Sequence, residues 1–472
     1  MKKTNNLYFI LLLTGSLIMG SCKKSYLVQN PNDSLTPDQA LSSESGLTSA
    51  VNGAYAGLRT QNNNVALYGR DFPIIGDLMA DNTFVESQNS GRYLIQYNYT
   101  MSSSDDIAAA IWSNAYTDIM RVNRVIDANV TGTKVASIKA EAYAIRGLLY
   151  FKLVTFFAKP YTDDPNALGV PLVLHYDPYN LPGRNTVTEV YQQILRDLQK
   201  GFQDGPDYVN SSRLSKYAIE ALLAKVYLYM DDNANAKAAA VDVINNGGFT
   251  LVNPGNYDTY WADPAHRTDM VETLFEVDAD VINNNGFDDF AGMYLNGYDD
   301  IYASMQLYNL YSATDVRQTV MAVGSTKGGA NAIVVTKFPN ATNGDRDNIK
   351  VLRLAEVYLI AAEASLPGNE ADALSYLNAL MAQRDPSFAG YSSTGAALLN
   401  DIVTERRKEL AFEGDRFFDM NRLKLPIVRA GNPGAIPAPL NIPYPDDRRL
   451  GPIPLTEIQS NPNIAGQQNP GY

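Results

Sequence analysis

A charged stretch near the end of the chain, residues 402–422, has the sequence IVTERRKELAFEGDRFFDMNR. Apolar residues recur in it every seven positions, and Arg406 and Glu413 interleave with them in the manner of a buried helical seam. The pattern therefore predicts that an arginine and a glutamate face inward. A buried carboxylate beside a buried cation can serve as a tuned catalytic acid, but buried ion pairs are also ordinary parts of a scaffold.

Other catalytic signatures are missing from the sequence. His175 and His266 are far apart, and neither has a second histidine four residues on, as a zinc-protease helix requires. No G-x-S-x-G elbow, Walker phosphate loop or G-x-G-x-x-G dinucleotide turn occurs. The acidic clusters lack calcium-loop spacing. We therefore expect no metal and no cofactor. A carboxylate pair for glycoside hydrolysis stays open, because such a pair is defined by distance in space and leaves no sequence spacing.

Aromatic residues are abundant, with 30 Tyr, 16 Phe and 2 Trp. In residues 283–302, NNNGFDDFAGMYLNGYDDIY, they alternate with Asn and Asp. Flat aromatic faces bind the C–H patches of sugars, and amides and carboxylates bind their hydroxyls, so this composition favours a carbohydrate platform. The alternative is the buried stripe of a helix, because the spacings of three and four are helical. The candidate ligand contacts are Tyr294, Tyr298, Trp261 and Tyr93.

The net charge limits the partners that the protein is expected to have. The chain has 472 residues, and 38 Lys and Arg against 51 Asp and Glu give a formal net charge of -13. Nucleic acids and anionic membrane surfaces bind basic patches, so neither is an expected partner. The length suits two or three domains, or one large helical domain.

The first 21 residues, MKKTNNLYFILLLTGSLIMGS, have the basic start, apolar stretch and small residues of a secretory signal. The apolar stretch is shorter than the about 20 residues that a membrane-spanning helix needs. The single cysteine, Cys22, follows, so no intrachain disulfide can form. This boundary resembles that of a bacterial lipoprotein, in which the cysteine is acylated and anchors the protein to a membrane. Residues 22–41 are polar and are interpreted as a tether.

Helical periodicity dominates the remaining chain. Apolar residues at spacings of three and four predict helices at residues 42–58, 107–130, 135–157, 187–202, 215–230 and 348–366. Strand signals are sparse, at residues 273–279 and 332–338. Between the helices lie long segments rich in aromatic residues, Asn and Asp, at 60–105, 250–345 and 425–472. We expect a mainly α fold with minor β-hairpins.

Two stretches resemble degenerate tetratricopeptide repeats, in which small residues let antiparallel helices pack closely. In LAKVYLYMDDNANAKAAAVDVI, Ala224 is followed by Ala236 at the offset that the repeat requires. In IAAEASLPGNEADALSYLNALMAQRDP, Ala361 precedes the turn at Pro367 and Ala373 follows it. Each stretch is expected to form a helix pair.

Taken together, several motifs resemble the SusD/RagB family of Bacteroidetes outer-membrane nutrient-binding lipoproteins. They are Cys22, EAYAIRGLLYFKLVTFFAKPY (141–161), LRLAEVYLIAAEA (352–364), ERRKELAFEGDRFFDMNR (405–422) and IPLTEIQSNPNIAGQQNPGY (453–472). The resemblance implies a SusD-like, mainly α fold with tetratricopeptide-like helix pairs, long irregular loops and minor β-hairpins. It also implies a helical region at 42–250 that forms one compact unit with a C-terminal region at 251–472.

In that family the charged helix is scaffold. The resemblance therefore places Arg406 and Glu413 in a buried ion network with Arg353, Glu356 or Glu363, and not in an acid/base pair.

The implied function is non-enzymatic. The lipoprotein would lie in the outer membrane facing outside the cell, capture oligosaccharide and pass it to a SusC-like TonB-dependent transporter, on which it acts as a lid. Peptide binding within the same family and glycoside hydrolysis on a helical scaffold are the alternatives. The lack of nucleophile, metal and cofactor motifs, together with the many aromatic residues, favours binding over hydrolysis.

Overall fold

The computed structural model describes residues 37–61, 64–325 and 327–472. The predicted signal, Cys22 and most of the predicted tether lie outside these residues. At the end of the tether, α2 (Pro37–Ala40) forms a single short helical turn.

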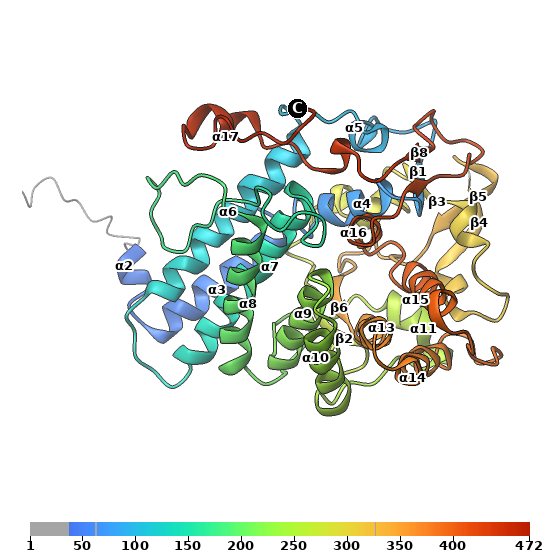
Figure 1. Ribbon diagram of the computed structural model, residues 1–472, viewed down its shortest axis with the longest axis horizontal. Helices are drawn as coiled ribbons and strands as arrows, with labels where there is room; N and C mark the ends of the chain where they lie inside the picture. The colour runs from blue at the N-terminus through green and yellow to red at the C-terminus, as the bar shows by residue number, and fades with distance from the viewer. Residues whose placement is uncertain (1–36, 62–63, 326) are drawn as a thin grey trace, which may run out of the picture.

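Four long helices pack side by side in the N-terminal half (Figure 1). They are α3 (Glu44–Arg59), α6 (Asp106–Asp127), α7 (Val135–Phe157) and α8 (Val187–Gln203). The side chains of Ser43, Asp105 and Thr186 cap three of them by accepting hydrogen bonds from first-turn backbone N–H groups. Helix α7 contacts the other three, so it is buried around most of its circumference. These helices confirm the predicted ranges to within a few residues.

Two helix pairs continue this layer. The first is α9 (Lys216–Tyr229) with α10 (Asn233–Asn246), and the second is α13 (Leu354–Ser365) with α14 (Glu370–Met381). Helix α10 also packs against α13, which places the pairs next to each other (Figure 1). The alanines that the sequence singled out are fully buried between the helices: Ala224, Ala236, Ala361 and Ala373. Both predicted helix pairs are present.

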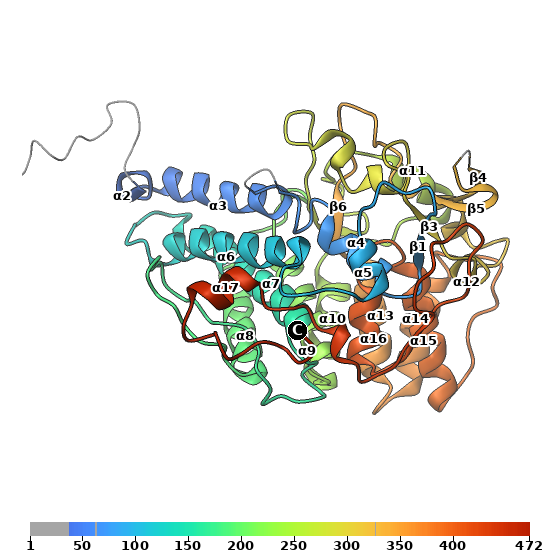
Figure 2. The same ribbon diagram turned by 90° about the horizontal axis from the view of Figure 1, so that it is seen from above.

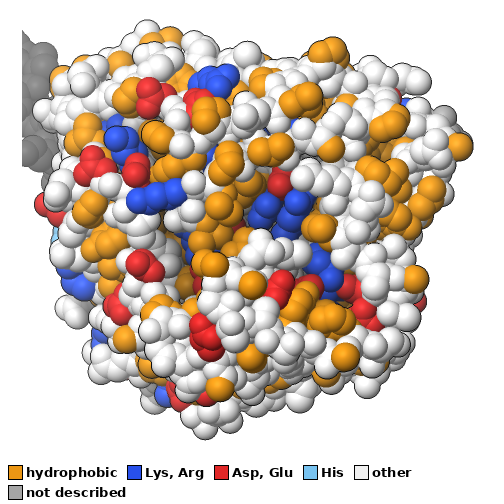
Figure 3. All heavy atoms as spheres, turned by 45° about the vertical axis from the view of Figure 1, so that its right-hand side comes forward, with side chains coloured by type: hydrophobic (Ala, Val, Ile, Leu, Met, Phe, Trp, Pro, Cys, Tyr) orange, Lys and Arg blue, Asp and Glu red, His pale blue; other side chains and the backbone are white. Residues whose placement is uncertain are grey.

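The strands are short, and all of their pairings within sheets are antiparallel. The largest sheet has the order β1 (Thr83–Val85), β3 (Ile301–Ala303), β5 (Gly329–Val335), β4 (Met321–Ser325). Two-stranded ribbons are formed by β2 (Thr273–Val277) with β6 (Ile349–Arg353), and by β7 (Ile427–Val428) with β8 (Asn441–Ile442). Strands β2 and β5 overlap the two predicted strands. Figure 3 shows the side of the molecule that carries β4 and β5, where hydrophobic side chains lie in small groups and Lys and Arg gather in a hollow.

The three aromatic-rich segments contain short elements that periodicity did not predict. Their helices are α4 (Asp71–Leu78), α5 (Leu94–Asn98), α11 (Tyr257–Ala262), α12 (Met305–Tyr308) and α17 (Leu455–Ser460). Every residue of α4 is buried, so α4 has no polar face and no amphipathic signal. The helix predicted at 348–366 starts later, at Leu354, because residues 349–353 pair with β2 as strand β6.

The charged seam at 402–422 is not one helix, which corrects the sequence-based expectation. It consists of α15 (Gly395–Glu409) and α16 (Arg416–Arg422), and Phe412 and Gly414 between them have positive φ angles of 68° and 84°. A Cβ on Gly414 would lie 2.4 Å from Pro73 Cα of α4, so the close approach of α4 requires glycine here. The chain turns because α4 crosses the seam at this point.

One hydrophobic core joins both halves of the chain, from Leu47 on α3 to Ile464 in the C-terminal segment. A second, smaller cluster lies between α13, α14 and α15. The C-terminal segment runs back over α6 and α7 (Figure 2), where the Asn469 amide donates to the backbone oxygens of Phe157 and Gly451 at 2.8 Å. Residues far apart in sequence therefore hold the two halves together.

Candidate ligand-binding site

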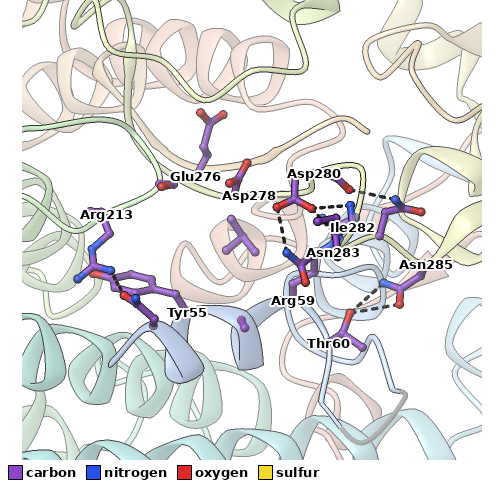
Figure 4. A pocket seen from close by; sticks show the side chains of 15 residues that line it. Tyr55, Arg59, Thr60, Arg213, Glu276, Asp278, Asp280, Ile282, Asn283 and Asn285 are labelled. Atoms are coloured by element: carbon purple, nitrogen blue, oxygen red, sulfur yellow. Dashed lines mark hydrogen bonds between the residues drawn. The ribbon is translucent and has the colours of Figure 1, made fainter. Parts of the chain in front are cut away.

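A groove of about 410 Å³ lies between the C-terminal part of α3 and the segment that follows β2 (Figure 4). Residues 52–60 line one side and residues 276–285 the other, and Ser212 and Arg213 lie at one end. Pairing of β2 with β6 fixes the second side, and packing of α3 against α6 and α7 fixes the first. The volume is in the range of small-ligand pockets.

Arg59, the last residue of α3, lies on the groove wall with only 4% of its surface exposed. Its Nη2 donates to Asp289 Oδ1 at 2.6 Å. Its Nε and Nη1 are buried and have no hydrogen-bond partner among the residues that the structure describes. Burial lowers the pKa of Arg59, and nearby aspartates, first Asp289, oppose that effect. A buried N–H group without an acceptor costs about 1–3 kcal/mol, so Arg59 gains from a ligand oxygen.

Glu276, on β2, borders the other side of the groove, but its carboxylate points away from Arg59 (Figure 4). It is fully buried, and its Oε1 accepts a hydrogen bond from the Ser211 hydroxyl. Its Oε2 has no hydrogen bond within the described part of the chain, although Lys350 Nζ lies 3.5 Å away. The wall of the groove thus carries unused donors, on Arg59.

The end wall of the groove is held rigidly by Tyr55 and Arg213. The Tyr55 hydroxyl donates to Glu141 at 2.7 Å and accepts from the Leu214 backbone N–H at 3.0 Å. The Arg213 guanidinium lies 4.6 Å from the centre of the Tyr55 ring and pairs with Glu141 at 2.8 Å. Both side chains are therefore already positioned before a ligand binds.

The loop at residues 280–289 forms the rim of the groove. Asp280 accepts hydrogen bonds from the backbone N–H groups of Ile282 and Asn283, which lower its pKa and fix the turn. The Asn285 amide donates to Thr60 Oγ1 at 2.9 Å and so ties the loop to the end of α3. Ile282 projects from this rim with 88% of its surface exposed.

Beyond the loop lies a second polar surface. The Arg92 guanidinium covers the Tyr298 ring at 3.6 Å from its centre, and Arg92 Nη2 donates to the Tyr298 hydroxyl at 2.7 Å. Arg70 forms an ion pair with Asp288, next to Phe287, which is 59% exposed.

Comparisons with known proteins identify the family. A family model described as starch-binding and associating with the outer membrane matches residues 25–228, and the SusD family model matches residues 302–472. SusD-like protein P2 of Formosa agariphila is 30% identical to this chain over 529 aligned positions, which cover 100% of both chains. The chain belongs to the SusD family. A SusD-like protein of Bacteroides ovatus is 22% identical, over 87% of this chain and 81% of its own.

Solved SusD structures have the same fold. A SusD superfamily protein from Bacteroides thetaiotaomicron is 29% identical with a TM-score of 0.82, covering 90% of this chain and 99% of that chain. One from Bacteroides vulgatus is 28% identical with a TM-score of 0.82, covering 91% and 99%. The surface glycan-binding protein A of Bacteroides fluxus shares the fold at 22% identity, with a TM-score of 0.72 and coverage of 91% and 100%.

Three of the four aromatic residues predicted to contact ligand are core residues in this SusD-family chain. Exposure is 2% for Trp261, 0% for Tyr294 and 4% for Tyr93. Trp261 and Tyr294 both pack against the Phe338 ring, and the Tyr93 hydroxyl donates to buried Asp71. The prediction of a surface platform is corrected for these three, because a buried ring has no free face for a sugar. Tyr298 alone is partly exposed, beneath Arg92.

The predicted ion-network residues lie in two buried networks. In the first, Arg406 pairs with Glu356 at 2.6 Å and with Asp419 at 2.7 Å. Arg422 joins it by pairing with Asp419 at 2.7 Å and with Glu363 at 2.6 Å. Burial would raise the pKa of Asp419, but Arg406 and Arg422 outweigh burial and lower it to about 2.

The second network surrounds Arg353. Its Nη2 pairs with Glu413 at 2.6 Å, and its Nη1 pairs with Glu409 at 2.9 Å and Glu272 at 3.0 Å. Arg384 pairs with the same Glu409 and Glu272, at 2.9 and 2.8 Å. Burial opposes ionisation of Glu409, but the surrounding arginines hold its pKa well below the usual range. Arg406 and Glu413 therefore belong to different networks.

The sequence reasoning missed Arg59. Arg59 gave no signal, because an arginine at the end of an amphipathic helix is ordinary.

Two features are absent from the described part of this SusD-family chain. No group of three or more His, Cys, Asp or Glu side chains within it has the arrangement to hold a metal ion. None of its helices is both long and apolar enough to span a bilayer.

Proposed function

We propose that this chain is an outer-membrane lipoprotein that binds oligosaccharide in the groove between α3 and β2. It then delivers the sugar to a SusC-like TonB-dependent transporter, acting as a non-catalytic lid. Tyr298 is kept as a contact beside the groove. Family membership and the glycan-binding name of a protein with the same fold support the ligand class.

A single observation carries the proposal. Buried Arg59 has unused N–H groups on the wall of a groove whose other side is lined by the polar residues 280 and 283–285. Buried polar groups are normally paired, and unpaired ones at a cavity are explained by a ligand or an ordered solvent molecule. A sugar hydroxyl can accept from an Arg59 N–H group and donate to an amide or carboxylate oxygen of the rim.

Binding is tested by calorimetry with the purified chain and a panel of oligosaccharides. Arg59→Lys keeps a positive charge for Asp289 but loses the guanidinium donors, so we expect about tenfold weaker binding with the fold intact. The matched control is Arg448→Lys, because Arg448 is exposed and lies outside the groove. Equal affinity in Arg59→Lys and the control would show that the groove is not the site.

The same samples test catalysis. Under the proposal, oligosaccharide is recovered with unchanged length after long incubation, and the protein migrates more slowly in glycan-containing gels. Release of new reducing ends, lost in Arg59→Lys, would instead assign a glycoside hydrolase to the groove.

Anchoring is tested at Cys22. Cys22→Ala removes the acylated thiol, so we expect the protein to leave the membrane fraction or to stay unprocessed. A processed variant that still sediments with the outer membrane would contradict the lipid anchor.

The transporter is tested by affinity capture of the chain after mild detergent extraction. A barrel-sized partner should co-purify, because a stable contact is expected to bury more than about 1,000 Å². Recovery of the chain alone, under conditions in which other outer-membrane complexes survive, would rule against the lid.

A further inference from the structure

We infer that the loop at residues 175–182, before α8, is a membrane-contact surface whose Tyr176, Tyr179 and Leu181 lie at the lipid–water interface. The inference rests on the proposed lipid anchor at Cys22. It goes beyond the anchor, because it states which face of the folded protein meets the bilayer. It follows from the exposed side chains of the loop, its bonded backbone and its position beside the tether.

The loop exposes three large apolar side chains within six residues. Tyr179 is 89% exposed, Leu181 43% and Tyr176 40%. Single exposed apolar residues are ordinary, whereas several on one short segment form a candidate contact surface. Tyrosine suits a membrane interface, because its ring can lie among apolar groups while its hydroxyl stays in water.

The backbone at the tip of this loop can leave water at little cost. The Tyr179 N–H donates to the Asp177 side chain at 2.9 Å, and the Asn180 N–H donates to the Asp177 backbone oxygen at 3.3 Å. Pro178 between them has no N–H group. Unsatisfied backbone groups are costly in lipid, so a tip whose donors are already bonded is suited to the interface.

The loop is also held in place without lipid. The Arg124 guanidinium lies 3.6 Å from the centre of the Tyr176 ring, and the Tyr176 N–H donates to Asp127 at 3.2 Å. At the other end, the Asn463 amide donates to the Leu181 backbone oxygen at 2.7 Å. Because the loop is already ordered, contact with a bilayer costs little conformational entropy.

The loop lies where the chain enters the folded protein. Tyr176 lines one cavity together with Leu41 and Ser42, which precede α3. Figures 1 and 2 show the loop before α8 at the same end of the molecule as α2. Residues 23–36 separate Cys22 from α2, and 14 residues span at most about 50 Å. An anchor at Cys22 therefore keeps this end near the bilayer, where even a weak contact is populated.

Electrostatic attraction does not account for such a contact. Arg124 is basic, but Asp127 and Asp177 beside it are acidic. His175, whose Nδ1 lies 3.0 Å from Asp127, is charged only when protonated. The whole chain has a formal net charge of -13. The contact is therefore apolar, and an anionic bilayer should bind the loop no better than a neutral one.

The experiment uses the full lipidated chain in phosphatidylcholine vesicles whose acyl chains are brominated near the headgroup. Tyr179→Trp keeps an aromatic ring and adds a fluorophore, while the native Trp112 and Trp261 are buried and give a constant background. We expect the added emission to fall at least about twofold relative to plain lipid, because bromine quenches a ring at the interface. The matched control is Val323→Trp, at a 58% exposed residue of β4 at the opposite end of the molecule, which should not be quenched (Figure 1).

A second lipid composition tests the chemistry of the contact. Part of the phosphatidylcholine is replaced by anionic phosphatidylglycerol, and we expect no increase in the quenching of Tyr179→Trp. An increase that is abolished by added salt would show that basic groups hold the bilayer, and it would overturn the inference.

Flotation of the same samples separates this inference from the proposed function. If the parent chain floats with the vesicles but Tyr179→Trp is quenched no more than the control, the inference is wrong and the anchor stands. If the parent chain does not float, the anchor is absent and both fail. Loss of the barrel-sized companion in Tyr179→Ser, without quenching in Tyr179→Trp, would assign the loop to the transporter and overturn the inference.

Discussion

Buried polar atoms are paired to different extents at the two ends of the β2–β6 ribbon. At the Thr273–Arg353 end, all three side-chain nitrogens of Arg353 donate to Glu272, Glu409 or Glu413. Beside the other end, Arg59 keeps two unused nitrogens on the wall of the groove. Complete pairing makes the first end a scaffold. Incomplete pairing beside a groove supports the proposal of a binding site at the second end.

An unpaired atom alone does not indicate a site. Arg406 Nη1 is also buried without a partner among the described residues, but Arg406 does not line the groove beside α3. Its other nitrogens bind Glu356 and Asp419. The comparison therefore depends on two observations together: unused polar atoms, and a space that a ligand can enter.

Removal of Glu409 should break the scaffold end most severely. Glu409→Ala leaves Arg353, Arg384 and Arg317 without their shared carboxylate, all within a site that is at most 1% exposed. Breaking a buried pair typically costs about 3–5 kcal/mol, and we expect at least that loss in the free energy of unfolding, measured by urea denaturation.

The control for this variant is Lys200→Ala, which removes an exposed ion pair with Asp204. Exposed pairs contribute about 0–1 kcal/mol, so its stability should change little. If Glu409→Ala loses no more stability than this control, the scaffold reading of the network is wrong.

Glu413→Ala should have the next largest effect. Glu413 binds Arg353 and Lys337, with 5% of its side chain exposed, at the turn between α15 and α16. We expect a loss of about 3 kcal/mol and a lower melting temperature, with oligosaccharide affinity unchanged in the folded protein. A stable Glu413→Ala protein with altered ligand binding would show that the ion network, and not the groove, has the functional role.

Much of the scaffold could be predicted from the sequence because its signals are local. The long helices carry spacings of three and four, and the small residues Ala224 and Ala361 mark closely packed pairs. The break at Gly414 could not be found in this way, since it depends on the approach of Pro73, which is distant in sequence. A heptad pattern continued through the turn although the helix did not.

The groove was less predictable for a different physical reason. The aromatic-rich segments were expected to present rings to solvent, but Trp261 and Tyr294 fill the core between α11 and the following loops. Composition cannot distinguish these uses, because the same rings serve a core and a sugar site. What marks the groove is the absence of partners for two nitrogens of Arg59, which becomes visible only in three dimensions.

Acid should weaken the scaffold end through Asp419. Its folded-state pKa, about 2, is below the unfolded value of 3.8, so the unfolded chain binds its proton first. This carboxylate therefore contributes stability above about pH 4, and the contribution is lost as pH falls from about 4 to about 2. The shift corresponds to about 2 kcal/mol. Across this pH range, the free energy of unfolding measured by urea denaturation should fall less in Asp419→Asn than in the parent protein. If this free energy depends on pH equally in both proteins, the role assigned to Asp419 is wrong.

The smallest effect is expected at Tyr298. Its size shows how far the ligand surface extends beyond the groove. Arg92 already covers the Tyr298 ring at 3.6 Å and binds its hydroxyl, so a sugar gains this ring face only by displacing a cation. Tyr298→Ala should therefore weaken oligosaccharide binding no more than about threefold, which is below 1 kcal/mol. Tyr179→Ala, at a residue that is 89% exposed and outside the groove, is the control. A tenfold loss in Tyr298→Ala alone would show that Arg92 moves aside and that the ligand surface extends past the rim loop.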